Sequence, residues 1–339
     1  MESQMSMSDP QSCDIEMPLR GVYYPLGFPL EIETNSQAIL EAAAESWGHF
    51  RRFFPVPPLQ LRIEVRQGKG GECPLPGESR EHRGLLVGVV DIENFYVTDL
   101  DRGFALAWVT QAAVAHRADF RLYLLEPIAW ELLCPFYLTP VHAACVALKE
   151  RGVLLCGDAG AGKSTLSYAC ARRQWTFLSD DYSFLVRGRQ ERFVIGNPYQ
   201  IRFRESTSEI FPELKQYPRK LHNGDLSIEI PTAALPEIST TRGCSIDYIV
   251  FLNRGVPGPP HLVPFPKDAA LGQFEKMACS GSKETRDAQR ASLRNLLAAE
   301  VLELRYTDLD AAVGVLEALV SDGGKSAEKA AKFETQPNA

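Results

Sequence analysis

The residues with the clearest chemical meaning form a glycine-rich loop between two apolar segments. The pattern G-x-x-x-x-G-K-[ST] of phosphate-binding loops is matched by Gly157, Asp158, Ala159, Gly160, Ala161, Gly162, Lys163 and Ser164. Glycines let the backbone turn its N–H groups toward a phosphate, and the helix that follows points its positive end at the same anion. The pattern predicts a nucleoside triphosphate site; a glycine-rich turn with an incidental lysine is the alternative.

Side chains at the end of this loop have distinct expected roles. Lys163 can reach the β- and γ-phosphates, and Ser164 can place a hydroxyl on Mg²⁺. We expect the whole loop, together with Thr165, to bind ATP. The reaction stays open at this point, because motors, switches, transporters and kinases all use such a loop.

A pair of adjacent acids follows at a fixed distance. Asp180 and Asp181 lie 17 and 18 residues after Lys163, which leaves room for one helix and one short strand that returns to the same sheet edge. Phosphoryl transfer needs one carboxylate to hold metal and often a second to deprotonate the attacking hydroxyl. The residues leave open which aspartate does which task; we favour Asp180 for the metal, with Ser164, and the spacing favours Asp181 as the base. Repulsion raises the pKa of one of the two. A solvated turn is the alternative.

Three basic side chains are weaker candidates. His142 lies 21 residues before Lys163, and its type alone fits a packed or capping histidine as well as an active-site group. Arg202 and Arg204 alternate in a strand-like segment, so both would project to the same side. There they would clamp a phosphate or an acidic acceptor, or else form surface ion pairs.

The elements that must position these residues fit a chain of two domains. A length of 339 residues, with 45% apolar and 23% charged residues, excludes wholesale disorder. We expect a loose N-terminal lead (1–15), a mixed α+β section (16–130), an α/β P-loop domain (131–322) and a disordered tail (323–339).

Apolar patterns predict the individual elements. Around the loop they indicate a strand at Val153–Cys156, a helix at Ser164–Arg173, a strand at Thr176–Leu178 and a short helix at Pro140–Lys149 that would carry His142. Elsewhere they indicate helices at Ser36–Phe54, Arg290–Ala299 and Leu309–Val320, the last capped by Thr307 and Asp310, a hairpin of Tyr182–Val186 and Arg192–Ile195, and strands at Leu59–Val65, Leu85–Val90, Phe95–Val97, Ile246–Leu252 and Val301–Tyr306.

Charge and cysteine content exclude several classes of partner and compartment. With 36 basic and 43 acidic residues the net charge is −7, which repels nucleic acid and anionic lipid. No apolar stretch reaches the roughly 20 residues that span a bilayer, and the first residues lack the apolar core of a secretory signal. The eight cysteines form no CxxC pair or zinc-type cluster, so we expect reduced thiols and a cytoplasmic protein.

Taken together, His142, the loop GVLLCGDAGAGKS (152–164) and FLSDD (177–181) resemble HPr kinase/phosphorylase and its relatives, bacterial serine kinases on a phosphoenolpyruvate-carboxykinase-like P-loop fold. The same order recurs in that family over about 40 residues without a gap. The resemblance implies an HPr-kinase-like P-loop domain in which His142 belongs to the active site and one aspartate of the pair acts as acid/base. The chain differs at Thr165, where the family usually has Glu, and Gln200–Phe203 is the nearest match to the family's E-x-R-G signature.

These observations favour an ATP- and Mg²⁺-dependent kinase that transfers a phosphoryl group to a hydroxyl, with serine of a protein or peptide as the expected acceptor. Two alternatives remain open: an ATPase or nucleotide-sensing module without transfer, and a kinase of a small molecule such as free serine. Because relatives of the resembled family often assemble, a homo-oligomer is among the expected states.

Overall fold

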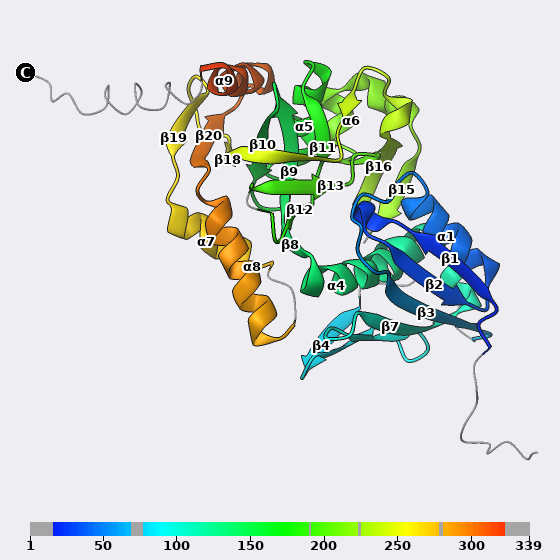
Figure 1. Cartoon of the computed structure of the whole chain (residues 1–339). Helices are drawn as coiled ribbons and strands as arrows, with labels where there is room; N and C mark the ends of the chain where they lie inside the picture. The colour runs from blue at the N-terminus through cyan, green and yellow to red at the C-terminus, as the bar shows by residue number, and fades with distance from the viewer. Residues whose placement is uncertain (1–15, 69–76, 190, 223–224, 278–280, 323–339) are drawn as a thin grey trace, which may run out of the picture. The chain divides into compact units, whose positions relative to one another are not determined.

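The computed structural model describes residues 16–68, 77–189, 191–222, 225–277 and 281–322. The chain divides into two units, Met1–Leu133 and Cys134–Ala339, and each is considered by itself (Figure 1). The expected lead (1–15) and tail (323–339) lie outside the described residues.

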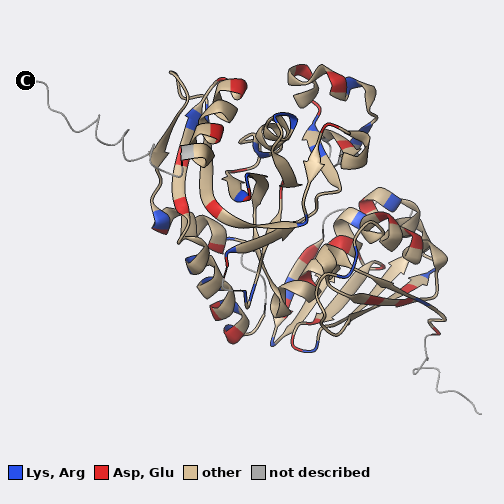
Figure 2. Ribbon diagram, turned by 45° about the horizontal axis from the view of Figure 1, so that its top comes forward, with Lys and Arg blue, Asp and Glu red and all other residues tan. Residues whose placement is uncertain are grey.

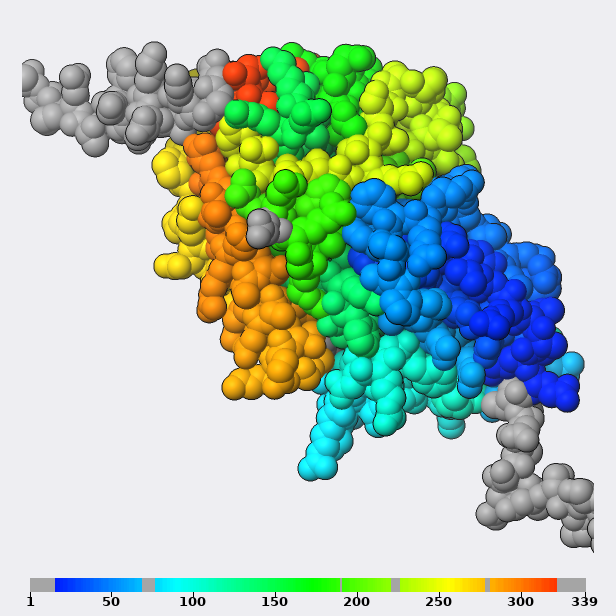
Figure 3. All heavy atoms as spheres, in the orientation of Figure 1, coloured from blue at the N-terminus to red at the C-terminus, as the bar shows by residue number. Residues whose placement is uncertain are grey.

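The first unit is built on a seven-stranded mixed sheet with strand order β1-β2-β3-β7-β6-β5-β4. Side chains alternate along it: on β3, Leu59, Leu61 and Ile63 are buried whereas Gln60 and Arg62 are exposed, as expected where one face carries the core. The unit contains β1 (Leu19–Tyr23), β2 (Leu30–Thr34), α1 (Gln37–Trp47), β3 (Leu59–Arg66), β4 (Glu78–His82), β5 (Leu85–Val89), β6 (Phe95–Asp99), β7 (Phe104–Thr110), α2 (Gln111–Ala115), α3 (Arg117–Phe120), the π-helical turn η2 (Arg121–Leu125), the short η1 (Pro25–Gly27) and most of α4 (Glu126–Phe136). The space-filling view shows β4, in cyan, projecting from this unit (Figure 3).

The predicted helix at Ser36–Phe54 is shorter in the structure. α1 ends at Trp47, where the Gly48 N–H donates to the Ala44 carbonyl at 2.7 Å. Glycine is a common helix terminator. The apolar pattern continues past the end because Phe54 packs elsewhere, stacked on Phe28 at a ring-centroid distance of 3.9 Å. The three strands predicted in this part of the chain are confirmed as β3, β5 and β6.

The second unit is a mixed α/β structure with a ten-stranded sheet and a smaller three-stranded sheet of order β14-β16-β15. The main sheet runs β17-β11-β9-β10-β18-β13-β12-β8, with β20 also paired to β18 and β19 to β20. Its elements are β8 (Leu138–Val141), β9 (Ala143–Leu148), β10 (Arg151–Cys156), α5 (Lys163–Arg172), β11 (Thr176–Ser179), β12 (Ser183–Val186), β13 (Phe193–Gly196), β14 (Gln200–Arg204), α6 (Thr207–Ile210), η3 (Pro212–Gln216), β15 (Arg219–His222), β16 (Asp225–Pro231), η4 (Thr232–Ala234), β17 (Ser239–Thr240), β18 (Gly243–Arg254), β19 (His261–Pro264), α7 (Lys267–Glu275), α8 (Lys283–Leu296), β20 (Glu300–Tyr306) and α9 (Leu309–Asp322).

Both faces of the main sheet are covered, which explains its uninterrupted apolar strands. On β10, Val153 and Leu155 belong to the core shared with α5 and α9, whereas Leu154 and Cys156 belong to the core shared with α7 and α8. Adjacent residues of a strand point to opposite faces, so a strand buried on both sides has no polar position. The absence of a polar residue from the run Val153–Cys156 follows from its burial on both faces.

The predicted helix at Pro140–Lys149 is wrong. The segment forms β8 and β9, and β9 pairs antiparallel with both β10 and β11. A short continuous apolar run fits a buried strand as well as a buried helix, and here the two neighbouring strands decide. His142 therefore lies between two strands instead of on a helix.

The remaining elements of this unit follow the predictions with small shifts. The hairpin is confirmed as β12 and β13, and the strands predicted after it are β18 and β20. α8 begins at Lys283, earlier than predicted, because Ser282 caps it by accepting from the Thr285 N–H. At α9 the cap is Asp308, which accepts from Ala311 at 2.7 Å, in place of the predicted Thr307 and Asp310.

Charged side chains are spread over both units (Figure 2), and the described cysteines are free. Figure 2 shows Lys and Arg interspersed with Asp and Glu along the helices and strands of each unit. The cysteines within the described residues are free thiols, and all but Cys244 are buried. Among the helices that the structure describes, none has the length and apolar character needed to cross a membrane.

Candidate active site

The phosphate-binding loop joins the end of β10 to the start of α5. Gly160 and Gly162 have φ angles of 87° and 99°, in the left-handed region where glycine is favoured. Both also lie close to other side chains: a Cβ on Gly160 would stand 3.2 Å from Arg204 Nη1, and one on Gly162 would stand 3.1 Å from the Tyr306 hydroxyl. Asp158, Ala159 and Gly160 are exposed, so the loop is open to an incoming anion.

Lys163 is the first residue of α5, and its side chain folds back over the loop. Only 6% of it is exposed. Its Nζ donates to the Gly157 and Asp158 carbonyls at 3.0 and 3.4 Å, and it lies 3.9 Å from Asp181 Oδ1. Burial lowers the pKa of Lys163, and the charge of Asp181 opposes that shift. The ammonium group is thus held where the loop starts.

Strand pairing explains why segments distant in sequence meet here. β9 runs antiparallel to β10, with Ala143 opposite Cys156, and β11 runs antiparallel to β9, with Ser179 opposite Cys145. The residue before β9, the loop after β10 and the acids after β11 therefore share one sheet edge. This edge is the usual location of ligand sites in open α/β sheets.

His142 and Asp181 form a direct pair at this edge. The His142 Nε2–H donates to Asp181 Oδ1 at 2.9 Å, and the imidazole stacks on Tyr182 at a ring-centroid distance of 5.3 Å. Burial alone would raise the pKa of Asp181, but the hydrogen bond and charge of His142, together with the charge of Lys163, lower it. About half of the Asp181 side chain is exposed (51%), so it can be reached from solvent.

Asp180 has a different environment from its neighbour. Its Oδ2 accepts the Arg202 backbone N–H at 2.6 Å, and its main-chain carbonyl accepts the Ser164 hydroxyl at 3.4 Å. Burial raises the pKa of Asp180 to about 6, and the charge of Asp181 adds to the rise. The raised pKa expected for one of the two acids therefore belongs to Asp180 and not to Asp181, which the spacing favours as the base.

These residues suit a magnesium ion held together with a nucleotide. Mg²⁺ usually takes one or two carboxylates, several waters and substrate phosphate oxygens. The Ser164 hydroxyl lies 3.4 Å from the main-chain carbonyl of Asp180, so the two residues that could hold the ion are neighbours next to the loop. Within the described residues no group of three or more His, Cys, Asp or Glu could hold a metal ion by itself.

Two arginines on β14 flank the loop and the acids. Arg204 is exposed, and its guanidinium lies against Gly160 without an ion-pair partner among the residues that the structure describes. Arg202 places its backbone N–H on Asp180, and its buried Nε finds no hydrogen-bond partner within the same residues. Arg204 thus lies beside the phosphate-binding loop, and the main chain of Arg202 contacts Asp180.

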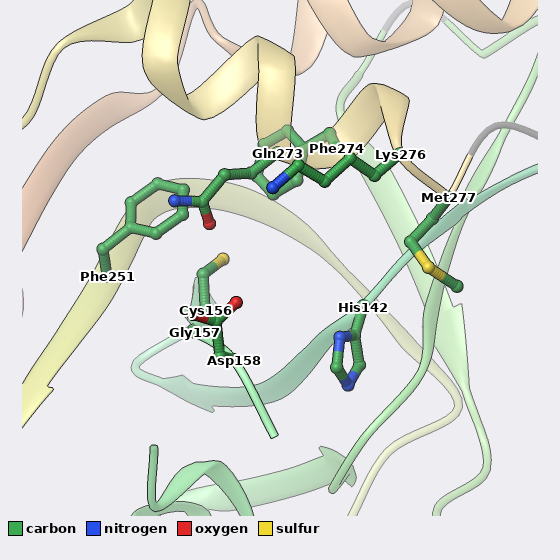
Figure 4. A pocket seen from close by; sticks show the side chains of 9 residues that line it. All are labelled: His142, Cys156, Gly157, Asp158, Phe251, Gln273, Phe274, Lys276 and Met277. Atoms are coloured by element: carbon green, nitrogen blue, oxygen red, sulfur yellow. The ribbon is translucent and has the colours of Figure 1, made fainter. Parts of the chain in front are cut away.

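A pocket opens beside the start of the loop, on the sheet face covered by α7 and α8. Its empty space, counted together with the solvent at its open mouth, is about 450 Å³. Figure 4 shows α7 side chains facing the ends of β9 and β10 across it. The pocket is lined by His142, Cys156, Gly157, Asp158, Phe251, Gln273, Phe274, Lys276 and Met277.

The sequence did not reveal the α7 wall of this pocket or the position of Tyr306. Only Ala270 and Phe274 are buried on α7, too few to give a helical period. Tyr306 is the last residue of β20, which pairs in parallel with β18, and β18 pairs in parallel with β10. Its place at the carboxyl end of a predicted strand of this sheet was the signal that could have identified it.

Comparisons with known proteins give little beyond this geometry. No family model matches the chain, and no curated protein matches it. Among solved structures it is similar to the HPr(Ser) kinase/phosphatase from Coxiella burnetii, with a TM-score of 0.31 and 15% sequence identity over 56% of this chain and 98% of that one. This is a weak structural similarity.

Proposed function

We propose that the second unit is an HPr-kinase-like P-loop unit that transfers the γ-phosphoryl group of ATP to a hydroxyl, with serine of a protein or peptide as the acceptor. One observation carries the proposal: the His142–Asp181 pair lies 3.9 Å from the ammonium group of the loop lysine. A loop that only binds nucleotide has no need of a hydrogen-bonded histidine and carboxylate at its γ-phosphate end.

Nucleotide binding would use the loop and the cations around it. Backbone N–H groups of the loop and the N-terminus of α5 would hold the phosphates, with Thr165 in the first helical turn. Lys163 would exchange its carbonyl contacts for the β- and γ-phosphates, and Arg204 would contact the phosphates from the opposite side of Gly160. When bound between Ser164 and Asp180, Mg²⁺ would offset the charge on the phosphates.

Transfer would use Asp181 as the base. Its carboxylate is ionised and half-exposed, whereas Asp180 is turned toward the Arg202 N–H. The acceptor hydroxyl gives its proton to Asp181 while its oxygen bonds to the γ-phosphorus, and the bond from that phosphorus to the β–γ bridging oxygen breaks to release ADP. His142 orients the carboxylate through its Nε2–H, and Lys163 stabilises the charge that develops on the phosphoryl oxygens.

The free thiols of the described cysteines support placing this reaction in the cytoplasm.

The test is incubation with γ-labelled ATP, Mg²⁺ and cell extract, comparing the unaltered protein with Asp181→Asn. We expect label in a discrete protein, and a loss of transfer of about a thousandfold in the variant with nucleotide affinity retained, the scale of a general base. Label only in free phosphate would show an ATPase, and label in a metabolite would show a small-molecule kinase. Wild-type transfer by Asp181→Asn would refute the base assignment.

A further inference from the structure

The pocket beside the loop lies at the end where the terminal phosphate is expected. A loop lysine reaches the β- and γ-phosphates, and Lys163 Nζ is held against the Gly157 and Asp158 carbonyls. Both of these residues line the pocket, and so does His142, the partner of Asp181. A molecule seated in the pocket would therefore meet the γ-phosphate and the base from the side opposite α5.

The inner wall of the pocket is apolar and firmly packed. Phe251 and Phe274 are each only 4% exposed, and their rings lie 6.0 Å apart. Cys156 and Met277 extend the same apolar surface. α7 is anchored to α8 at both ends, by the Lys267 Nζ bond to the Leu297 carbonyl at 2.6 Å and by the Arg290–Glu275 ion pair at 2.9 Å. The wall is thus a preformed surface for an apolar group.

The rim of the pocket is polar and reaches solvent. Asp158, Gln273 and Lys276 are exposed, and Figure 4 shows Gln273 extending from α7 toward Cys156. With the residues described by the structure, Lys276 forms no ion pair and Gln273 no hydrogen bond. A lysine ammonium at the rim of an apolar pocket suits a ligand that carries a carboxylate beside its apolar part.

Resting on the phosphotransfer proposed above, we infer that this pocket recognises the acceptor as a peptide segment in which the serine stands beside an apolar side chain and an acidic residue. The apolar side chain would fill the space against Phe251 and Phe274, and the carboxylate would pair with Lys276. The pocket is open to solvent at its rim, which leaves a path for a chain that continues beyond the serine.

The probes are synthetic peptides with one central serine and with Leu or Gly beside it, each combined with Glu or Lys at a neighbouring position. The unaltered protein should phosphorylate the Leu/Glu peptide best, with a loss of about tenfold when Gly replaces Leu. Lys276→Glu should reverse the preference between Glu and Lys peptides by about fivefold, the scale of an exposed ion pair. Lys283→Glu, an exposed lysine at the start of α8, is the matched control and should leave the preference unchanged.

Binding separates failure of this inference from failure of the proposed function. Peptide binding in the presence of a non-hydrolysable ATP analogue and Mg²⁺, measured by fluorescence anisotropy, should show the same order of peptides. Gln273→Trp, which would fill the pocket, should abolish this binding, whereas Lys283→Trp, outside the pocket, should retain it. Selective binding without transfer would refute the kinase reaction and leave the pocket assignment standing.

Transfer without discrimination among the peptides would overturn the pocket assignment alone, as would peptides that neither bind nor react. A loss of nucleotide affinity in Gln273→Trp would also overturn it, because the pocket would then hold the nucleobase. Phosphorylation of free serine in preference to every peptide would identify a small-molecule pocket and contradict the inference.

Discussion

Arg204→Ala is the substitution whose effect follows most directly from the geometry around the loop. The guanidinium lies against Gly160, in the middle of the loop, and has no ion-pair partner among the described residues. Its removal would therefore break no ion pair with those residues, and the fold should persist. Its cost should appear when a triphosphate binds.

The expected magnitude is that of one charge-assisted hydrogen bond. Such bonds contribute about 1.5 to 3 kcal/mol, and the lower value applies because Arg204 is exposed. A loss of about 1.5 kcal/mol corresponds to roughly tenfold weaker binding of ATP. Arg204→Lys should recover part of this loss, since it keeps the charge without the planar, forked geometry.

Isothermal titration calorimetry with ATP and Mg²⁺ measures the effect, and adenosine serves as the ligand without phosphates. The matched control is Arg219→Ala on β15 of the same three-stranded sheet, where the arginine pairs with Glu205 at 2.6 Å. We expect adenosine binding to be unchanged in both variants and ATP binding to fall only in Arg204→Ala. Unchanged ATP affinity in Arg204→Ala would refute the placement of a phosphate beside Gly160.

Three other substitutions test separate parts of the account. Lys163→Ala should abolish ATP turnover in a phosphate-release or transfer assay, and turnover at the wild-type rate would remove the loop from the reaction. His142→Gln should slow transfer by about tenfold or more in a single-turnover assay at saturating ATP, because the carboxylate loses its orienting partner; an unchanged rate would make the histidine structural. Glu131→Gln should flatten the pH dependence of stability in urea unfolding, and equal slopes in the two proteins would contradict the burial of an ionisable acid.

The sign of the Glu131 effect follows from its environment. Burial raises the pKa of Glu131 from 4.5 to about 7, even though its Oε1 accepts the Tyr96 hydroxyl at 2.8 Å. The folded state thus binds more protons than the unfolded state between these values, so stability falls as the pH rises from about 4.5 through 7. This pKa difference corresponds to at most about 3 kcal/mol in the free energy of unfolding. Glu131→Gln removes this penalty above pH 7.

The elements that depend on short stretches of sequence were predicted correctly. The glycines of the loop, the apolar run of β10 and the apolar patterns of α5 and α9 all lie within short windows, and each element was predicted close to its observed bounds. The meeting of the loop with Asp180 and Asp181 was also predictable, because one helix and one short strand return the chain to the same edge.

Other features depend on contacts that no short window contains. Whether the segment around His142 forms strands or a helix is decided by its pairing with β10 and β11. Which aspartate has the raised pKa depends on which carboxyl group is buried. Burial raises the pKa of Asp180 even though the backbone N–H of Arg202, 22 positions away, opposes that shift. The wall of the pocket formed by α7 was not predictable. Only two side chains of this helix are buried, and its position depends on packing against α8.

The most direct test of the central claim is a crystal structure with a non-hydrolysable ATP analogue and Mg²⁺. Transfer requires one acceptor oxygen between the base and the γ-phosphorus, with reacting atoms about 3 to 3.5 Å apart. We predict the γ-phosphate in contact with Lys163, and its phosphorus about 4 to 6 Å from Asp181 Oδ1, the gap that one such oxygen fills. The account would be contradicted if the γ-phosphate pointed away from the His142–Asp181 pair and the nucleobase lay beside that pair instead.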